Sequence, residues 1–292
     1  MLLSSEVYFL EDQYLPRGEA RVSLNDRGYL FGDTAFETLR SYGGFVFRLE
    51  RHLERLAYSA KVLGLELPLP REQLTARVRE AVGRCEAQDC YVRVTLSRGE
   101  GGAGISTKNF DHPSLSIIVR PFHPYPAQAY EEGIRTQVVG PRKVPPECLD
   151  PAIKSGGAYL PSIIARRELD RQGMMEGVQL AVAGHVVSGL VSNVFAVSGR
   201  QLLTPDLASG CLPGITREAL LQLAPSVGLE PVERRLTLEE LGQSDELFFA
   251  NSLMECLPVR QLAQRSFQPA PGPFTRKLLA AFQLLVQSEK RT

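Results

Sequence analysis

The sequence has few of the residues that would build a disulfide framework or a metal site. Its five cysteines are an odd number with no CxxC pair, and its four histidines are scattered without an HExxH motif. No apolar run approaches the roughly 20 residues that a membrane-spanning helix needs. Lys plus Arg number 33 and Asp plus Glu number 33, so the balanced charge gives no electrostatic footprint for nucleic acid. These absences favour a reduced protein that uses no metal, nucleic acid or membrane.

The N-terminus and the overall composition favour a cytoplasmic protein with an ordinary core. The first stretch carries Glu6, Glu11 and Asp12 and has no basic region, which does not fit a signal peptide. Hydrophobic residues make up 43% of the chain and charged residues 23%, close to the norm for globular proteins. The 292 residues correspond to about two domains.

Hydrophobic spacing predicts mixed helices and strands without internal repeats. Apolar residues recur at helical spacing over residues 49–63, and Gly64 is expected to end that helix. Helices are also expected over residues 32–42, 71–85, 213–224 and 272–288. Strands are expected over residues 7–10, 45–49, 91–97, 114–120, 134–140, 178–183, 185–189, 193–199, 201–205 and 245–251.

A proline-rich stretch divides the chain. Residues 121–130, PFHPYPAQAY, hold three prolines and no periodicity, which is typical of a linker. We therefore predict a small α/β domain over residues 1–120, a linker over 121–132 and a larger domain over 133–292. The helices and strands do not alternate strictly, so the expected class is a two-domain α/β or α+β enzyme.

Three segments carry residues suited to a binding site, and each also has an ordinary explanation. Lys154 lies among small and apolar residues, where desolvation would make its amine nucleophilic, although a surface lysine is commoner. Gly214, Ile215 and Thr216 precede a helix and would suit a phosphate or form a simple N-cap. The glycines of residues 98–104 lack the following helix that a dinucleotide fingerprint requires, so a loop is expected there.

Taken in order, seven segments of the chain resemble the fold-type IV pyridoxal-phosphate enzymes, a class IV aminotransferase family, and are closest to 4-amino-4-deoxychorismate lyases. The segments are NDRGYLFGDTAFETLR (25–40), HLERL (52–56), SRGEGGAG (97–104), KSGGAY (154–159), GLVSNVF (189–195), LPGITRE (212–218) and NSLMECLPV (251–259). The resemblance covers nearly the whole chain. It implies a D-amino-acid-aminotransferase-like fold, with a small N-terminal α/β domain and a larger cofactor-binding domain that contains a barrel-like sheet.

The resemblance also implies a cofactor, partners and a role for each matching residue. The cofactor is pyridoxal 5'-phosphate, the substrate is a small-molecule amine, and the enzyme is a homodimer. Lys154 would form a Schiff base with the cofactor and then act as the base, and Thr38 would assist proton transfer. The other residues implied at the cofactor are Arg55, Tyr159, Ser188, Asn193, Ile215, Thr216, Ser252 and Leu253. The residues implied at the substrate are Tyr29, Arg98, Arg40 and Lys108.

One position departs from the family pattern. Ser188 stands where the family usually carries a Glu whose carboxylate keeps the pyridine nitrogen protonated. Serine can share a hydrogen bond but cannot balance a pyridinium charge. The departure disfavours vigorous transamination more than cofactor binding. A lyase is compatible with it, because loss of enolpyruvate from aminodeoxychorismate leaves an aromatic ring.

Further comparison within the resemblance favours the lyase. The pattern SRGxGGxGxST from Ser97, Thr38 and the segment NSLM (251–254) resemble lyases rather than branched-chain transaminases. Ala103 stands where many lyases carry an arginine, so the carboxylate anchor stays open. We expect a lyase of the folate pathway that converts 4-amino-4-deoxychorismate to 4-aminobenzoate and pyruvate. The alternatives are a class IV aminotransferase acting on branched-chain, D- or aromatic amino acids, and a pyridoxal-phosphate binder with little catalysis.

Overall fold

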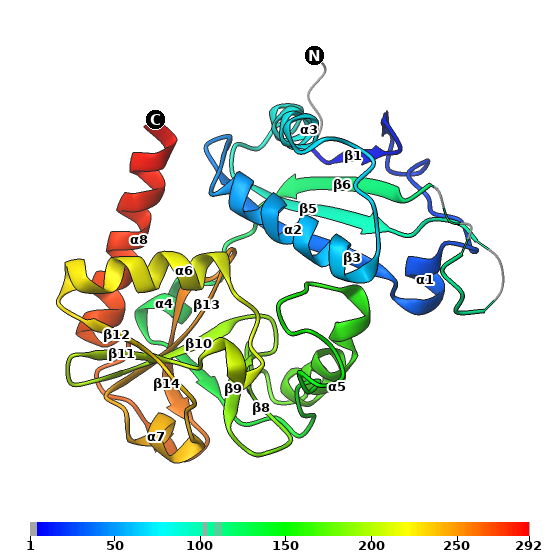
Figure 1. Ribbon diagram of the computed structural model, residues 1–292. Coiled ribbons are helices and arrows are strands. Elements are labelled where there is room, and N and C mark those ends of the chain that lie inside the picture. The colour runs from blue at the N-terminus through cyan, green and yellow to red at the C-terminus, as the bar shows by residue number, and fades with distance from the viewer. Residues whose placement is uncertain (1–4, 102–103, 109, 111, 292) are drawn as a thin grey trace. The chain divides into compact units, whose positions relative to one another are not determined.

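The computed structural model describes residues 5–101, 104–108, 110 and 112–291 and divides into two compact units (Figure 1). The first unit comprises Met1–His123 with Ile153–Ala158, and the second comprises Pro124–Ala152 with Tyr159–Thr292. Ala103 and part of the glycine-rich motif lie outside the described residues. The division between the units falls inside the predicted linker.

Two features of this division differ from the contiguous one expected from the sequence. The linker range 121–132 contains a helix, α4 (Ala127–Glu131), so it is not only a connection. Residues 153–158 belong with the first unit because Ser155 forms a bridge with Ala35 of that unit. Such a long-range pairing leaves no periodic signal in the sequence.

The first unit is a six-stranded sheet whose strand pairs are all antiparallel, in the order β2-β1-β6-β5-β3-β4 (Figure 1). Its strands are β1 (Val7–Leu10), β2 (Gln13–Leu15), β3 (Thr34–Tyr42), β4 (Phe45–Val46), β5 (Cys90–Ser97) and β6 (Ser114–Pro121). Its helices are α1 (Arg27–Phe31), α2 (Leu49–Leu63) and α3 (Arg71–Gly83). Leucines and valines of α2 and α3 pack with the inward side chains of the strands in one hydrophobic core.

The prediction for residues 49–63 is confirmed, and the helix predicted over residues 32–42 is wrong. The first segment forms α2, which ends where Gly64 adopts the left-handed conformation at φ 63°. The second forms β3, in which burial changes with a period of two rather than 3.6. Residues 34–40 pair with β5, so hydrogen bonds to a strand distant in sequence decide the structure.

The second unit contains a seven-stranded sheet in the order β12-β11-β10-β13-β14-β15, with β7 also paired to β14, and a two-stranded sheet of β8 and β9. Its strands are β7 (Ile134–Thr136), β8 (Val178–Leu180), β9 (Val186–Gly189), β10 (Asn193–Ser198), β11 (Gln201–Thr204), β12 (Glu230–Glu233), β13 (Glu246–Asn251), β14 (Glu255–Leu262) and β15 (Arg265–Ser266). Bridges from Val138 to Val178 and from Val186 to Leu236 link β8 and β9 to the segments that follow β7 and β12. Strand pairing therefore runs around the unit, as the expected barrel-like sheet requires.

The helices of the second unit complete its core. Besides α4, they are α5 (Leu160–Asp170), α6 (Ile215–Leu223), α7 (Leu238–Gln243) and α8 (Pro273–Arg291), with short 3-10 turns at Leu207–Ser209 and Ala224–Val227. All five cysteines are free thiols. Within the described ranges, no helix combines the length and apolar character needed to cross a membrane. No group of three or more His, Cys, Asp or Glu side chains among those residues is placed to hold a metal.

Candidate functional site

Lys154 lies on a short segment that pairs with β3 in the first unit. The Phe36 N–H donates to the Lys154 carbonyl oxygen at 2.9 Å, and the Lys154 N–H donates to Ser59 Oγ of α2 at 3.0 Å. The Lys154 backbone is thus held on both sides. Its Nζ lies 4.8 Å from the centroid of the Phe36 ring. A fixed backbone with the amine beside an aromatic ring is suited to a positioned nucleophile.

A buried ion network occupies the opposite face of β3, because Glu37 points away from Phe36. The Glu37 carboxylate accepts hydrogen bonds from Arg55 Nε at 2.7 Å and Arg55 Nη2 at 2.8 Å. It also lies 2.8 Å from Nδ1 of His52. The sequence indicated only Arg55 at this place. The structure adds that Glu37 grips the Arg55 guanidinium in a bidentate pair, which fixes its plane.

The protonation states of this network follow from burial and pairing. Burial alone would raise the pKa of Glu37, but the charge and hydrogen bonds of Arg55, together with His52, hold the pKa at about 2. Burial also lowers the pKa of His52, although the Glu37 carboxylate opposes that shift. We therefore assign an ionised Glu37 and a neutral His52 that donates its Nδ1 proton.

Arg93 is a second cation beside Phe36, and sequence reasoning missed it. It lies on β5 directly opposite Thr38. Its guanidinium lies 3.8 Å from the centroid of the Phe36 ring, and its Nε donates to Thr95 Oγ1 at 3.2 Å. Side chains two apart on a strand share a face, so Thr38 and Arg93 lie on the face of the sheet that carries Phe36. The available signal was an arginine within the alternating strand YVRVT.

The arginine implied at the substrate by the glycine-rich motif serves an internal role in the first unit. Arg98 is buried, and its Nε donates to Asp33 at 2.6 Å. Its Nη1 and Nη2 donate to the carbonyl oxygens of Gly64 and Leu63 at 3.0 and 2.6 Å. Arg98 therefore ties the end of α2 to Asp33.

The other three residues implied at the substrate lie in different surroundings. The Arg40 guanidinium, near the far end of β3, is 4.3 Å from the centroid of the Tyr42 ring and 3.9 Å from that of Phe122. Tyr29 on α1 and Lys108 are exposed. Each of these roles stays a prediction.

In the second unit, the start of α6 is shaped by a close backbone approach. Asn193 Nδ2 donates to the Leu212 carbonyl oxygen at 3.0 Å. A Cβ at Gly214 would lie 2.1 Å from Asn193 Oδ1, so only glycine fits there. Ile215 and Thr216 then begin the helix, both buried. The first N–H groups of a helix have no intrahelical acceptor and favour a bound anion.

The loop after β13 is organised by Asn251. Its Oδ1 accepts hydrogen bonds from the N–H groups of Leu253 and Met254 at 2.9 and 2.7 Å. Its Nδ2 donates to the Val191 carbonyl oxygen at 3.2 Å. The segment with Ser252 and Leu253 is thereby held beside the turn at residues 189–192.

Ser188 lies in this same region, on β9. It is buried and stands opposite Gln179 of β8. Tyr159 is the residue that precedes α5, and it is half-buried. Gln179 was not among the residues expected at the site, because a single polar residue in the strand VQLAVA does not indicate one.

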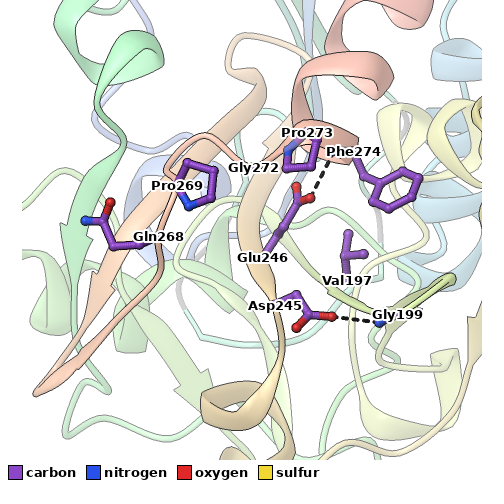
Figure 2. Close-up of a pocket in the computed structure, with 9 residues that line it drawn as sticks. All are labelled: Val197, Gly199, Asp245, Glu246, Gln268, Pro269, Gly272, Pro273 and Phe274. Carbon is purple, nitrogen blue, oxygen red and sulfur yellow. Dashed lines mark hydrogen bonds between the residues drawn. The ribbon is translucent and has the colours of Figure 1, made fainter.

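The hollow drawn in Figure 2 is separate from all of these residues. Its volume is about 240 Å³, and its lining includes Glu246 and Phe274 but none of the residues implied at the cofactor or substrate. The Glu246 carboxylate accepts hydrogen bonds from the N–H groups of Phe274 and Thr275 at 2.9 and 2.7 Å. The hollow thus lies at the cap of α8, where a carboxylate satisfies the first N–H groups of the helix.

A lysine amine with a fixed backbone and a helix start with unpaired N–H groups indicate an enzyme of amine chemistry. Comparison with known proteins makes the class specific. The profile of the amino-transferase class IV family matches residues 34–262, which is more than half of the chain, and the protein belongs to this family.

Named relatives extend along nearly the whole chain. A Methanocaldococcus jannaschii protein assigned to the branched-chain-amino-acid aminotransferases is 35% identical over 276 residues, 94% of this chain and 94% of its own length. The aminodeoxychorismate lyase of Bacillus subtilis is 30% identical over 283 residues, 96% of this chain and 94% of its own. The solved branched-chain amino acid aminotransferase of T.th., with pyridoxamine 5'-phosphate, superposes with a TM-score of 0.92 at 26% identity, covering 97% of this chain and 95% of its own.

Proposed function

We propose that the protein binds pyridoxal 5'-phosphate through the residues implied by its family resemblance. The solved relative with pyridoxamine 5'-phosphate supports this cofactor. Lys154 would hold it through its amine, and Arg55 would pair with its phosphate as a cation fixed by Glu37. When bound, the cofactor supplies an electron sink for the pair released as the C–H bond beside an amine is broken.

The remaining roles follow the surroundings of each residue. Ile215 and Thr216 would bind the phosphate with the N–H groups at the start of α6. Ser252 and Leu253 would do the same from the loop that Asn251 organises. The other residues proposed at the cofactor are Tyr159, Ser188 and Asn193.

We propose that Lys154 moves the proton at the amine-bearing carbon. The substrate would bind on the face of the first sheet that carries Thr38, where Thr38 would assist that proton. Arg93 supports this location, because it places a cation suited to a substrate carboxylate directly opposite Thr38. Arg40, Tyr29 and Lys108 stay as further candidates for substrate contacts.

The reaction that this site supports best is the aminodeoxychorismate lyase reaction. The observation that carries it is the pair of neutral side chains, Ser188 and Gln179, at the position where a carboxylate would favour transamination. The second candidate is an aminotransferase acting on branched-chain amino acids, which the Methanocaldococcus jannaschii relative favours.

Product analysis separates the two candidates. Protein loaded with pyridoxal phosphate is expected to release pyruvate and 4-aminobenzoate in equal amounts from 4-amino-4-deoxychorismate. In a parallel reaction it should transfer the amino group of leucine or valine to 2-oxoglutarate more slowly. Amino transfer without pyruvate release would replace the lyase by the aminotransferase. Neither product, with the cofactor still bound, would leave a cofactor-binding protein with little catalysis.

We infer that the protein is a homodimer, as the resemblance implies. Helix α5 in the second unit exposes three large apolar side chains, Leu160, Ile163 and Ile164, of which Leu160 is 62% exposed. Clustered exposed apolar residues are typical of a protein–protein interface. These three side chains support a second copy of the chain as the partner.

The homodimer predicts a clear response to charge on α5. Replacing Leu160 and Ile163 together by Glu should convert the dimer to a monomer, because burying two carboxylates in an apolar interface is costly. Light scattering after size-exclusion chromatography measures the mass directly. Arg167→Gln, at an exposed position on the same helix, should stay dimeric. A double variant that keeps twice the mass of one chain would place the interface elsewhere.

A further inference from the structure

A buried polar cluster lies at the paired strands β8 and β9 of the second unit. Gln179 and Ser188 are directly opposite in the antiparallel register, so their side chains emerge on the same face. Gln179 is 0% exposed and Ser188 is 4% exposed. Ser162 of α5 contacts the amide, with 3.2 Å between its Oγ and Gln179 Oε1. Buried polar groups of this kind normally find hydrogen-bond partners.

Counting protons identifies an unused donor in this cluster. The single hydroxyl proton of Ser188 is donated to the Gly189 carbonyl oxygen at 2.7 Å. The single hydroxyl proton of Ser162 is shared between Gln179 Oε1 and the Leu190 carbonyl oxygen, which is 2.9 Å away. Gln179 Nε2 carries two protons and is buried, yet it has no acceptor among the residues that the structure describes. An acceptor from outside the chain would satisfy it.

The nearest buried carboxylate does not take this place. Glu176 Oε1 accepts hydrogen bonds from the N–H groups of Gly177 and Leu190 at 3.0 and 2.8 Å, and its Oε2 accepts one from Ser192 Oγ at 2.9 Å. Both oxygens are therefore engaged in holding the turn that follows β9. Burial also raises the pKa of Glu176, although these hydrogen bonds oppose the shift. Glu176 serves the backbone of the turn rather than a ligand.

We propose that Gln179 is the partner of the pyridine nitrogen of pyridoxal phosphate in this protein, and that its Nε2–H donates to the unprotonated nitrogen. The inference rests on the proposed function, because the family resemblance places the usual glutamate at Ser188. The short Ser188 side chain has already donated its proton, whereas Gln179, directly across the strand pair, has a donor left. A neutral pyridine nitrogen is an acceptor and matches this donor. A buried pyridinium would face no counter-ion from either side chain.

This assignment has a consequence for the substrate class. An unprotonated ring withdraws electrons less strongly, so it stabilises a carbanion beside the amine less well. The enzyme then favours substrates in which loss of the proton is coupled to departure of a leaving group. A substrate whose product becomes aromatic has this property, because aromatisation supplies the driving force that the ring does not.

The protonation state of the ring nitrogen can be measured independently of turnover. Holoprotein is prepared with pyridoxal phosphate labelled with ¹⁵N in the ring, and its ¹⁵N NMR shift is recorded at neutral pH. The wild-type signal is expected at the position of a neutral pyridine. Gln179→Glu is expected to move the signal to the pyridinium position, because a carboxylate would then balance the charge. A pyridinium signal in the wild-type protein would overturn the proposal without any variant.

Two further variants keep the test decisive. Ser188→Glu restores a carboxylate at the family position and is also expected to produce the pyridinium signal. Gln179→Leu removes the donor at similar volume, and its signal should move toward that of a pyridine without a hydrogen bond. A pyridinium signal from Ser188→Glu with an unchanged signal from a folded Gln179→Glu would remove Gln179 from the ring.

Failure of the proposed function would look different. A wild-type protein that takes up no pyridoxal phosphate, judged by the absence of a visible absorbance band, would overturn the proposed function and this inference with it. A bound cofactor whose ring nitrogen is protonated would overturn only the role of Gln179.

Discussion

Replacing Lys154 with alanine is expected to abolish covalent attachment of the cofactor and to lower turnover by roughly 10²- to 10⁴-fold, the range for loss of a general acid–base group. The amine is positioned by backbone hydrogen bonds of its own residue to Phe36 and Ser59, and a lysine elsewhere in the chain would lack this placement. The fold should persist, because the two backbone hydrogen bonds of residue 154 do not need its side chain.

Attachment can be measured separately from turnover. Holoprotein is reduced with borohydride, digested and examined by mass spectrometry, and the pyridoxyl group is expected on the Lys154 peptide. Lys61→Ala, at an exposed position on α2, should keep both the label and the activity. Added methylamine should restore part of the activity of Lys154→Ala, since a small free amine can occupy the vacated space and carry the proton. A label on a different lysine would show that Lys154 has been assigned wrongly.

Local signals carried most of the fold prediction. Residues 49–63 form α2 because their apolar spacing, and a glycine in the left-handed conformation after them, agree with the helix. Residues 32–42 form β3 instead of the predicted helix, since pairing with β5 outweighs a weak local preference. The pairing of Ser155 with Ala35, which brings Lys154 into the first unit, joins residues far apart in the chain and has no local signature.

The site was predicted where order along the chain was enough and missed where function depends on pairs. Lys154, Arg55 and Thr216 could be named because each falls in a recognisable segment. The grip of Glu37 on Arg55 joins β3 to α2, and only the register of the fold reveals it. Gln179 is a similar case, because a lone glutamine in an apolar strand gains meaning only opposite Ser188.

Replacing Glu37 with glutamine is expected to lower the free energy of unfolding of the first unit by about 3–5 kcal/mol, as removal of one partner from a buried ion pair does. The substitution leaves the Arg55 guanidinium without its anion and His52 without its charged acceptor. The orientation of Arg55 would also be lost, so the affinity for pyridoxal phosphate should fall. Hydrogen exchange of the α2 and β3 amides, measured at pH 7 on the apoprotein, reports the stability of this unit by itself.

The pH dependence tests the cause of the effect. The pKa of Glu37 is about 2 in the folded state and 4.5 ordinarily, so its contribution is present above pH 4.5 and is lost as the pH falls from 4.5 toward 2. The lowered pKa of His52 acts in the same direction, because below pH 6.5 the unfolded chain binds a proton that the folded chain does not. The raised pKa of Glu176 acts oppositely, but in the second unit.

The stability difference between the wild-type protein and Glu37→Gln should therefore shrink as the pH is lowered through this range. Glu50→Gln provides the matched control, since Glu50 lies on the surface of α2 and pairs with Arg79 at 2.7 Å. Exposed pairs of this kind contribute roughly 0–1 kcal/mol, so the control should change protection little. An equal loss of protection in both variants, or a Glu37→Gln effect that stays constant down to pH 3, would show that the buried charge of Glu37 does not stabilise β3 against α2.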